Sequence, residues 1–535
     1  MGKKEKQSDW KRVLVIVEIK CKKRLTDLRQ KVVLQLAGYA REVFHRQPDR
    51  HFVHSFSIIN STLRCWLYTR SGALASSSGD LNTDEGIRFF CRVFNGYLNM
   101  NEEDLGSAAI AAAPTTVGGR AIIRDRPFFT THALITRGTT CWPARPDGEI
   151  KDALQPTWPW VLKIAWRYPG RKHEGIMLLE CQRRGVKGVA EYIAHDEGEQ
   201  SIAVHGILGK QYIESAVPFD LKWRGNKRPS PYSNDHRQKR SKQSATLDST
   251  ASETATSANG SYASTLASIP ETTNEYQAEE KAAQGTTITE IPVPDRIYTR
   301  VLMSRGKPID EFTDPVELLL AMGDAVRAHR SLLIDGHILH RDISVNNIMI
   351  TIPQSPRTDG FHGFLIDLDH AISSDELGRH SGAPERTGTL EFMSTDALVG
   401  LPSFRHIYYD DLQSFMWVFF WIIIKDRATT PALRFWGNHE PNLTGPYKER
   451  LIKDEVSFQY HLGNWFDDDL GKAVSKAASD LRRALWPAGA REELEREDVR
   501  DKLYAKVIKA FDDALVDARQ EADLREVVPR DRTAD

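Results

Sequence analysis

One short segment constrains the fold of this 535-residue chain more than any other. It opens with His340-Arg341-Asp342, continues to Asn347 and ends at Asp367. Two strand-like apolar runs between Asn347 and Asp367 enclose a turn-rich loop, which predicts a hairpin that brings these two residues side by side. Phosphoryl transfer from a nucleotide needs oxygen ligands for Mg²⁺ and a nearby carboxylate that orients the attacking hydroxyl. The segment supplies both kinds of group.

The same pattern resembles the protein kinase signature, in which H-R-D-x-x-x-x-N precedes D-F-G. The resemblance implies that Asp342 is the catalytic base and that Asn347 and Asp367 bind the metal ion. Here the second motif reads Asp367-Leu368-Asp369, so an aspartate replaces the usual hinge glycine. The alternative, that these are ordinary loop carboxylates, is disfavoured by the spacing of all three residues.

A second kinase-like stretch lies downstream. Residues 388–396 resemble the end of an activation segment, G-T-x-x-Y-x-A-P-E, with Asp396 in the place of the closing glutamate. The literal Ala383-Pro384-Glu385 precedes this stretch, whereas the closing triplet must follow it. Asp411, just before an apolar helix, is then expected to hold the backbone of the catalytic loop.

The upstream half carries weaker signals. The run ending in Lys163 resembles the strand whose lysine grips the nucleotide phosphates, and Glu174 fits its ion-pair partner, although a solvated surface pair is the alternative. The phosphate-covering stretch, 135–142, contains only Gly138 where kinases usually have three glycines. Its neighbour Arg137 could contact phosphate or lie exposed in a turn. Ser344 stands where many serine/threonine kinases carry a catalytic-loop lysine.

Taken together, the spellings H-R-D-I-S-V-N-N, L-I-D-L-D and D-D-L-Q-S-F-M-W resemble the fungal-type protein kinase family. Residues 35–42 and 47–50 in the N-terminal region are also similar to that family. The resemblance implies a two-lobed α+β kinase fold, ATP and Mg²⁺ as cofactors, and serine or threonine hydroxyls of proteins as substrates. The catalytic residues that it implies are Asp342, Lys163, Asn347 and Asp367. The nucleotide site that it implies comprises Gly138, Lys163, Glu174, Asn347 and Asp367.

Composition and pattern divide the chain into six expected parts. A polar stretch poor in large apolar residues separates two apolar regions and cannot bury enough surface to fold by itself. The expected parts are an N-terminal α+β unit (1–117), a kinase N-lobe (118–224), a disordered insertion (225–290), the last N-lobe strand (291–303), a C-lobe (304–515) and a charged tail (516–535).

Hydrophobic periodicity adds individual elements. Asp314, Pro315 and Glu317 mark the start of a long helix through a capping box and a proline at its first position. The apolar run 415–424 is half the length needed to span a bilayer, so we expect a core helix. Strands are expected at 52–59, 63–68, 160–165, 298–303, 348–352 and 364–366, and further helices at 32–44 and 172–184.

Net charge and cysteines limit the partners and the compartment. Lys and Arg total 72 against 73 Asp and Glu, so no global field favours nucleic acid or a membrane. Five cysteines without paired spacing suit free thiols in a reducing compartment. We therefore expect an intracellular protein, cytoplasmic or nuclear. Basic residues between 227 and 242 could form a bipartite import signal, or simply a solvated linker.

Two other functions fit parts of the pattern. Small-molecule phosphotransferases share the kinase-like core and often carry a doubly acidic triplet, but Arg341 and the 388–396 stretch favour protein substrates. A catalytically silent scaffold would explain the poor glycine loop and Ser344, but all three residues of the catalytic pattern are present.

The N-terminal unit contains a separate motif. Glu18-Ile19-Lys20 follows an apolar strand and Gln35 lies on the next helix, as in the E-x-K motif of nuclease-like folds. No convincing upstream aspartate accompanies it, Asp9 being the only nearby candidate, and charges at strand ends are common. An inert or binding module is the favoured interpretation.

Overall fold

The computed structural model describes residues 10–22, 28, 30–107, 115–148, 157–200, 295–373, 388–399, 404–424, 441–461, 471–486 and 489–527. The expected insertion, its basic cluster at 227–242 and the triplet at 383–385 lie outside these residues. Two compact units are distinguished, 1–219 with 293–535 and the intervening 220–292, and everything below concerns the first.

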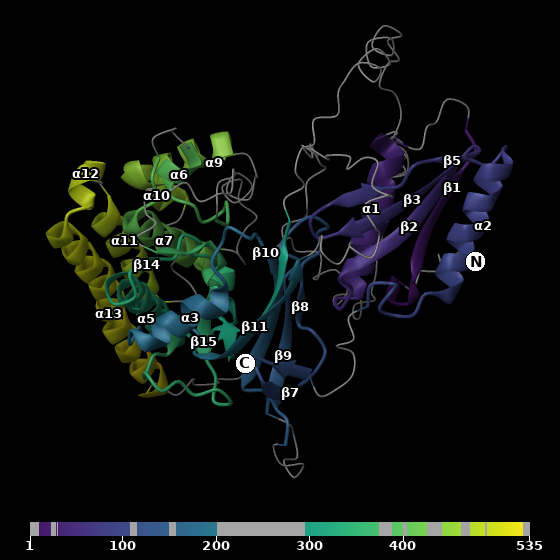
Figure 1. Ribbon diagram of the computed structural model, residues 1–535. Coiled ribbons are helices and arrows are strands. Elements are labelled where there is room, and N and C mark those ends of the chain that lie inside the picture. Colours follow the sequence, from purple (N-terminus) through teal and green to yellow (C-terminus); the bar gives the residue numbers. More distant parts are fainter. Residues whose placement is uncertain are drawn as a thin grey trace, which may run out of the picture. The chain divides into compact units, whose positions relative to one another are not determined.

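The N-terminal unit is built on a five-stranded sheet (Figure 1). β1 (Val15–Lys20) runs parallel to β2 (Phe52–Ile59), which pairs antiparallel with β3 (Thr62–Thr69). The other elements are β4 (Ala73–Ala75), β5 (Gly79–Asp80), the short 3-10 helix η1 (Trp10–Arg12) and the helices α1 (Gln30–Arg46) and α2 (Asp84–Asn99).

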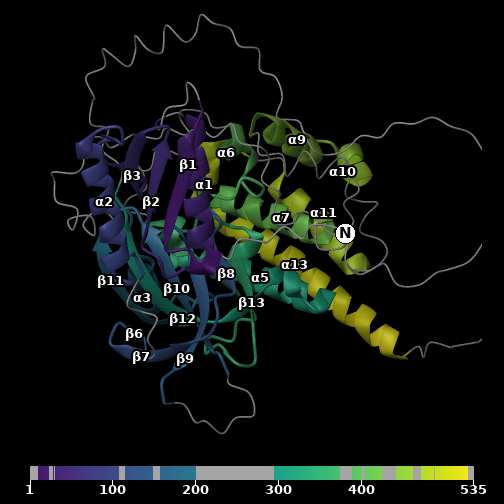
Figure 2. The ribbon, with the colours of Figure 1, turned by 90° about the vertical axis from the view of Figure 1, so that its right-hand side faces the viewer.

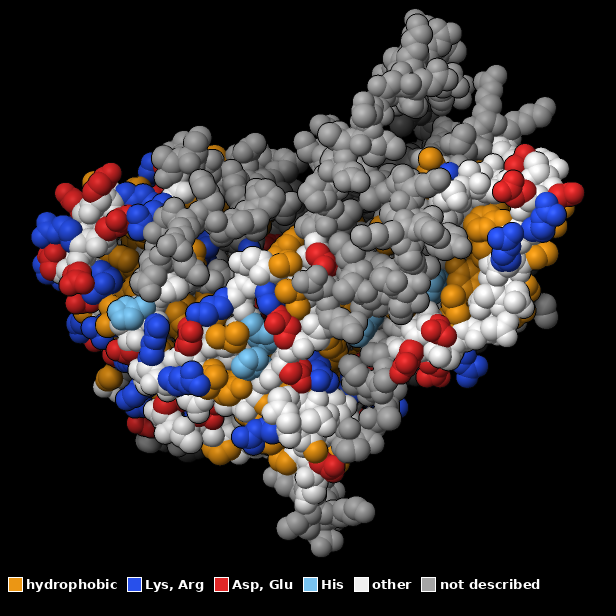
Figure 3. Space-filling view, viewed as in Figure 1, with side chains coloured by type: hydrophobic (Ala, Val, Ile, Leu, Met, Phe, Trp, Pro, Cys, Tyr) orange, Lys and Arg blue, Asp and Glu red, His pale blue; other side chains and the backbone are white. Residues whose placement is uncertain are grey.

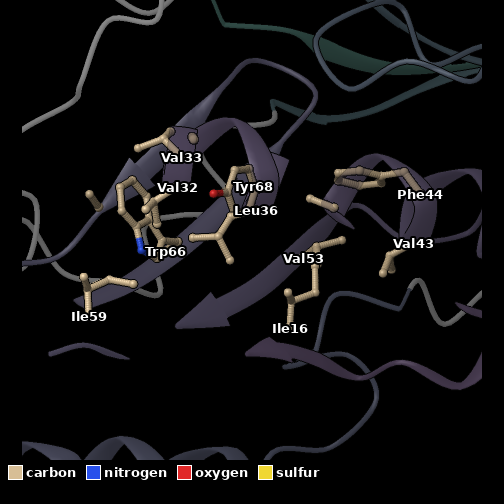
Figure 4. Close-up of a cluster of buried hydrophobic side chains, with 13 residues drawn as sticks. Ile16, Val32, Val33, Leu36, Val43, Phe44, Val53, Ile59, Trp66 and Tyr68 are labelled. Atoms are coloured by element: carbon tan, nitrogen blue, oxygen red, sulfur yellow. The ribbon is translucent and has the colours of Figure 1, made fainter. Parts of the chain in front are cut away.

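One face of α1 supplies much of this unit's core. Its buried residues Val32, Leu36, Val43 and Phe44 recur at helical spacing, so one apolar stripe faces the sheet. Figure 4 shows them packed against side chains of β1, β2 and β3, including Trp66. By contrast, α2 leaves part of its surface apolar, visible at the right of Figure 3. Its exposed apolar residues include Ile87, Phe94 and Leu98.

A seven-stranded antiparallel sheet forms the N-lobe, in the order β11-β12-β10-β9-β7-β6, with β8 added beside β9. β11 and β12 flank the expected insertion and are direct neighbours, with Gln200 opposite Ile297. The ends of that long segment therefore meet on one sheet. The elements are β6 (Thr115–Val117), β7 (Arg120–Arg124), β8 (Phe129–Thr130), β9 (Thr140–Pro146), β10 (Trp160–Arg167), α3 (Glu174–Arg183), β11 (Tyr192–Gln200) and β12 (Ile297–Ser304).

The C-lobe is mostly helical, with short strands that carry the catalytic segment (Figure 2). Its first helical and strand elements are β13 (Gly306–Pro308), η4 (Ile309–Glu311), α5 (Pro315–Ile334), β14 (Ile338–Leu339), η5 (Val345–Asn347), β15 (Ile348–Thr351), β16 (Gly363–Leu365), η6 (Leu368–His370) and β17 (Ile372–Ser373). The remaining helices are α6 (Thr395–Val399), α7 (Tyr408–Ile424), α9 (Pro441–Lys453), α10 (Glu455–His461), α11 (Lys472–Leu485), α12 (Arg491–Leu494) and α13 (Glu497–Val527).

Two helices form the centre of this lobe. α5 begins at the N-cap Asp314, whose carboxylate accepts the Glu317 N–H at 3.0 Å. The Glu317 carboxylate reaches back to the N–H of Thr313 at 2.7 Å, so the expected capping box is displaced by one residue. Every residue of α7 is buried, and from Phe415 to Ile424 the helix is apolar on all sides, as expected for a core helix. None of the described helices combines the length and the apolar character needed to cross a bilayer.

The expected α+β class, with a strand-rich N-lobe and a helical C-lobe, is confirmed. α13 continues past Leu515 to Val527, so the expected tail begins within a helix. The boundaries proposed for the six parts of the chain stay predictions.

Candidate active site

A lysine and a glutamate from the N-lobe form the first half of the site. Lys163 lies on β10, between Leu162 and Ile164, which point into the lobe's core, so strand alternation turns the lysine to the opposite face. Glu174 is the first residue of α3, where the positive end of the helix dipole favours a carboxylate. Lys163 Nζ and Glu174 Oε2 are 2.7 Å apart, and both side chains are buried. The pair is therefore not the solvated surface contact weighed as the alternative.

The catalytic hairpin brings two aspartates to the same lysine. Asp367 follows β16 with φ of 64°, a left-handed backbone conformation, and its Oδ1 lies 2.9 Å from Lys163 Nζ. Asp369 Oδ2 lies 3.0 Å from the same nitrogen. The N–H of Leu368 donates to Glu174 Oε1 at 3.1 Å, which ties α3 to this turn.

Arg137 completes the cluster. Its Nη1 lies 2.7 Å from Asp369 Oδ2 and 3.3 Å from Asp367 Oδ1. Sequence reasoning treated Asp369 as the replacement of a hinge glycine and as part of a doubly acidic triplet, but not as a site residue. It left Arg137 between phosphate contact and exposed turn. The doubly acidic triplet was the one signal that could have marked Asp369 as part of the site.

Burial and opposite charges shift the pKa values in this cluster. Burial alone would raise the pKa of Asp367, but Arg137 and Lys163 outweigh it and hold that pKa well below its usual range. Burial would lower the pKa of Lys163, yet Asp367 and Asp369 raise it well above its usual value. Burial raises the pKa of Glu174 to about 7, although the Lys163 ammonium opposes this shift.

Hydrogen bonds hold both the side chain and the backbone of Asp342 in the catalytic loop. Asp342 Oδ1 accepts hydrogen bonds from the N–H and the hydroxyl of Thr389, each at 2.9 Å. Asn347 Nδ2 donates to the backbone oxygen of Asp342 at 2.7 Å. The N–H of Ile366 donates to the Asn347 carbonyl at 3.0 Å. Asn347 therefore lies beside Ile366, the residue before Asp367, as the hairpin prediction required.

Asp411 contacts this loop as expected. Its Oδ2 accepts the N–H of Arg341 at 3.0 Å and lies 2.8 Å from His329 Nε2, while its Oδ1 lies 2.8 Å from His406 Nε2. Arg341 has φ of 67°, a costly conformation for a residue other than glycine. The buried carboxylate therefore fixes a strained backbone directly before Asp342.

The same cluster includes a possible metal site. Ligand oxygens of Glu174, Asp367 and Asp369 lie within 4.8 Å of one another, the one such group among the residues that the structure describes. Carboxylate oxygens are the ligands that Mg²⁺ prefers, so these residues fit that ion. Asn347, the other expected ligand, uses its Nδ2 toward Asp342, which leaves its amide oxygen as the group that could face a metal.

The end of the activation-like segment is anchored from several sides. Asp396 forms an ion pair with Arg491 at 2.7 Å, and Ser394 Oγ donates to Asp410 at 2.6 Å. Lys448, fully buried on α9, donates to the backbone oxygens of residues 391 and 393 at 2.6 and 2.9 Å. These contacts attach the segment to α7, α9 and α12, and Thr389 joins it to Asp342 of the catalytic loop.

In the N-terminal unit, the residues of the E-x-K motif lie close together. Glu18 Oε1 and Lys20 Nζ are 2.9 Å apart, and Gln35 contacts both side chains. Within the described ranges, Glu18 belongs to no group of three or more acidic, histidine or cysteine side chains that could hold a metal ion. An inert or binding module stays the prediction for this unit.

Comparison with known proteins agrees with the kinase motifs. No curated protein matches the chain. The ROP18 kinase domain, solved in complex with AMP-PNP and sucrose, is similar at 11% identity and a TM-score of 0.33, over 76% of this chain and 83% of that one. The family model for fungal protein kinases matches residues 1–423, which include the N-terminal unit, the N-lobe and the catalytic segment. The chain therefore belongs to the fungal protein kinase family.

Proposed function

We propose that this protein transfers the γ-phosphoryl group of ATP to serine or threonine hydroxyls of proteins. One observation carries the proposal. Lys163 and Glu174 from the N-lobe meet Asp367 from the catalytic hairpin in a single buried cluster. Phosphoryl transfer is catalysed mainly by positioning and charge stabilisation, and a buried lysine among carboxylates beside the catalytic loop suits that task.

Each residue then has a defined role. The Lys163 ammonium, oriented by Glu174, binds phosphate oxygens. Asp342 acts as the general base. Thr389 donates to its Oδ1, and no side chain or N–H of the described residues is found to hydrogen-bond the second carboxylate oxygen, which can accept the proton of a substrate hydroxyl. Asp367, with Asn347 or Asp369, would hold Mg²⁺, which supplies compensation for the negative charge of the phosphates.

Support for protein substrates comes from the segment at 388–396. Its contacts through Asp396, Ser394 and Lys448 fix it as an ordered surface next to Asp342. A peptide needs such a platform, whereas a small molecule does not.

A second candidate is a small-molecule phosphotransferase, favoured by one observation. Asp369 contacts Lys163 and Arg137 directly and so belongs to the charged cluster rather than to a hinge. Doubly acidic triplets of this kind are a feature of that class. The activity test below separates the two candidates.

The test compares Asp342→Asn with the parental protein and with Asp335→Asn, a control at the C-terminal end of α5. A degenerate serine/threonine peptide library tests for a protein kinase, and choline with an aminoglycoside tests for the small-molecule class. We expect peptide phosphorylation that Asp342→Asn lowers by about 10²- to 10⁴-fold and that the control retains. ATP binding should survive in both variants. Parental turnover in Asp342→Asn, or phosphorylation of the small molecules alone, would contradict the proposal.

A further inference from the structure

The loop that covers the phosphate site is attached to the N-terminal unit. We use the name covering loop for residues 131–139, between β8 and β9. Its ends are joined by the Thr131 N–H, which donates to the Thr139 oxygen at 2.9 Å, and its backbone is tied to β10 by the Trp166 N–H, which donates to the Arg137 oxygen at 2.7 Å. The side chain of Arg137 reaches the carboxylates of Asp367 and Asp369. The position of this loop therefore affects the charged cluster directly.

Three consecutive residues of the covering loop contact α1 or the core beneath it. His132 Nε2 lies 2.8 Å from Glu42 Oε1, and its ring lies 4.6 Å from that of His45. Leu134 packs against the hydrophobic core of the N-terminal unit. Between these two residues, the backbone oxygen of Ala133 accepts a hydrogen bond at 2.7 Å from Arg70.

Arg70 is the central residue of this attachment. It follows β3, is 2% exposed, and its guanidinium lies over the Phe44 ring at 4.3 Å from the ring centre. A Cβ at Gly138 would fall 2.5 Å from Arg70 Nε, and Gly138 has φ of 54°. The one glycine of the covering loop is therefore required by the close approach of Arg70, independently of any bound nucleotide.

We infer that the N-terminal unit positions the covering loop for nucleotide binding, with Arg70 as the positioning residue. This inference rests on the proposed function. A glycine-rich loop adapts to the phosphates through its own backbone, whereas a loop with one glycine depends on an external support. Here Arg70 donates a hydrogen bond to Ala133 and closely approaches the backbone of Gly138. These two residues lie on either side of Leu134, so Arg70 fixes the place from which Arg137 enters the site.

The chain offers a matched pair of variants. Arg50 is also 2% exposed, lies in the same unit and donates to a backbone oxygen, that of Leu14, at 2.7 Å, but no contact with the covering loop involves it among the described residues. Burial lowers the pKa of both guanidinium groups to about 10. Arg70→Met and Arg50→Met therefore remove equivalent buried charges, and only the first removes the support of the loop.

The experiment measures the Kd for Mg²⁺-AMP-PNP by calorimetry, together with amide hydrogen exchange of residues 131–139 in the nucleotide-free protein, all in the full-length chain. We expect Arg70→Met to raise the Kd about tenfold, as for one lost hydrogen bond to a charged group, and to speed exchange in the covering loop. Arg50→Met should change neither quantity, even where it lowers the Tm equally. Glu42→Gln alters the contact with His132 and a local ion pair with the neighbouring Arg41 on α1. It should give a smaller rise in Kd, and it keeps the test valid where Arg70→Met fails to fold.

The outcomes separate this inference from the proposed function. A parental protein that binds AMP-PNP, with unchanged Kd and exchange in Arg70→Met, would overturn the inference alone. Equal effects of Arg70→Met and Arg50→Met would also overturn it, because general destabilisation would then be the cause. A parental protein that fails to bind AMP-PNP would overturn the proposed function and the claim about nucleotide affinity. In that case, faster hydrogen exchange of the covering loop in Arg70→Met, but not in Arg50→Met, would still support the attachment of this loop to the N-terminal unit.

Discussion

Replacing Asp411 by asparagine should reduce both the stability and the activity of this kinase. The side chain is fully buried and serves three partners, the Arg341 N–H, His329 and His406. Asparagine keeps one acceptor oxygen and places an amide donor where the second oxygen was, so at least one partner is left without an acceptor. Breaking such a buried charged network costs about 3–5 kcal/mol. For a lobe of this size, that loss lowers the Tm by roughly 10 °C.

The effect on turnover has a separate cause. The Arg341 backbone is held at φ of 67°, and such strain costs about 1–3 kcal/mol. Without the hydrogen bond to Asp411, the backbone can relax and displace Asp342, and a displacement of about 1 Å can cost about 10²-fold in rate. Turnover per folded molecule should therefore fall by that order below the temperature of unfolding.

The control is Asp324→Asn. Asp324 is a partly buried carboxylate on α5 of the C-lobe, and it accepts the backbone N–H of His362, in the loop before β16, at 2.7 Å. Thermal unfolding and peptide phosphorylation of both variants are compared. The reasoning is refuted if Asp411→Asn keeps parental turnover, or if both variants lose turnover in proportion to the Tm alone.

Three further predictions concern the cluster and the insertion. Asp367→Ala should weaken Mg²⁺-dependent ATP binding in calorimetry, whereas unchanged binding would indicate another ligand. Because the pKa of Glu174 is raised to about 7, acidification through neutral pH should protonate Glu174, weaken its pair with Lys163 and lower kcat/KM. In Glu174→Gln this fall of kcat/KM at acidic pH should vanish. If the fall persists in the variant, another group causes it. Deletion of residues 226–284 should leave the Tm and peptide phosphorylation nearly unchanged, because β11 and β12 pair directly and loop length costs only ~0.6 kcal/mol per doubling. Nuclear accumulation should fall, because the deletion removes the basic cluster. A large decrease in Tm would show that the segment packs against a lobe.

Much of the fold could be predicted because its signals are local. The strand at 52–59 was predicted at its observed bounds, and the helix after Asp314 begins where its cap and proline place it. Alternating or helical periodicity within a single element contains this information. The displaced partner of Glu317, Thr313 instead of Asp314, shows the limit, because either N–H is within reach of the same side chain.

The site was predicted in part for the same reason. Motif spacing identifies Lys163, Asp342, Asn347 and Asp367, whose positions relative to one another follow from strand and hairpin geometry. The contact of Lys163 with Asp369 joins residues 206 apart in sequence, and that of Arg70 with Ala133 joins the residue after β3 of the N-terminal sheet to the covering loop of the N-lobe. Such contacts depend on tertiary packing, and no local pattern in the sequence contains them.

Two departures from the kinase pattern, Asp369 and Arg137, are best explained together. Asp369 replaces the hinge glycine and adds a largely buried carboxylate to a group that already contains Glu174 and Asp367. Without a further cation, these two carboxylates would repel the added one. Arg137 stands in a loop that contains one glycine where kinases usually have three, and it contributes a second cation beside Lys163. With both changes, two cations face three carboxylates, so the cluster stays close to neutral while keeping an excess of negative charge that suits a divalent cation. Either change alone would shift the charge balance of the cluster, whereas together the added carboxylate and the added cation compensate one another.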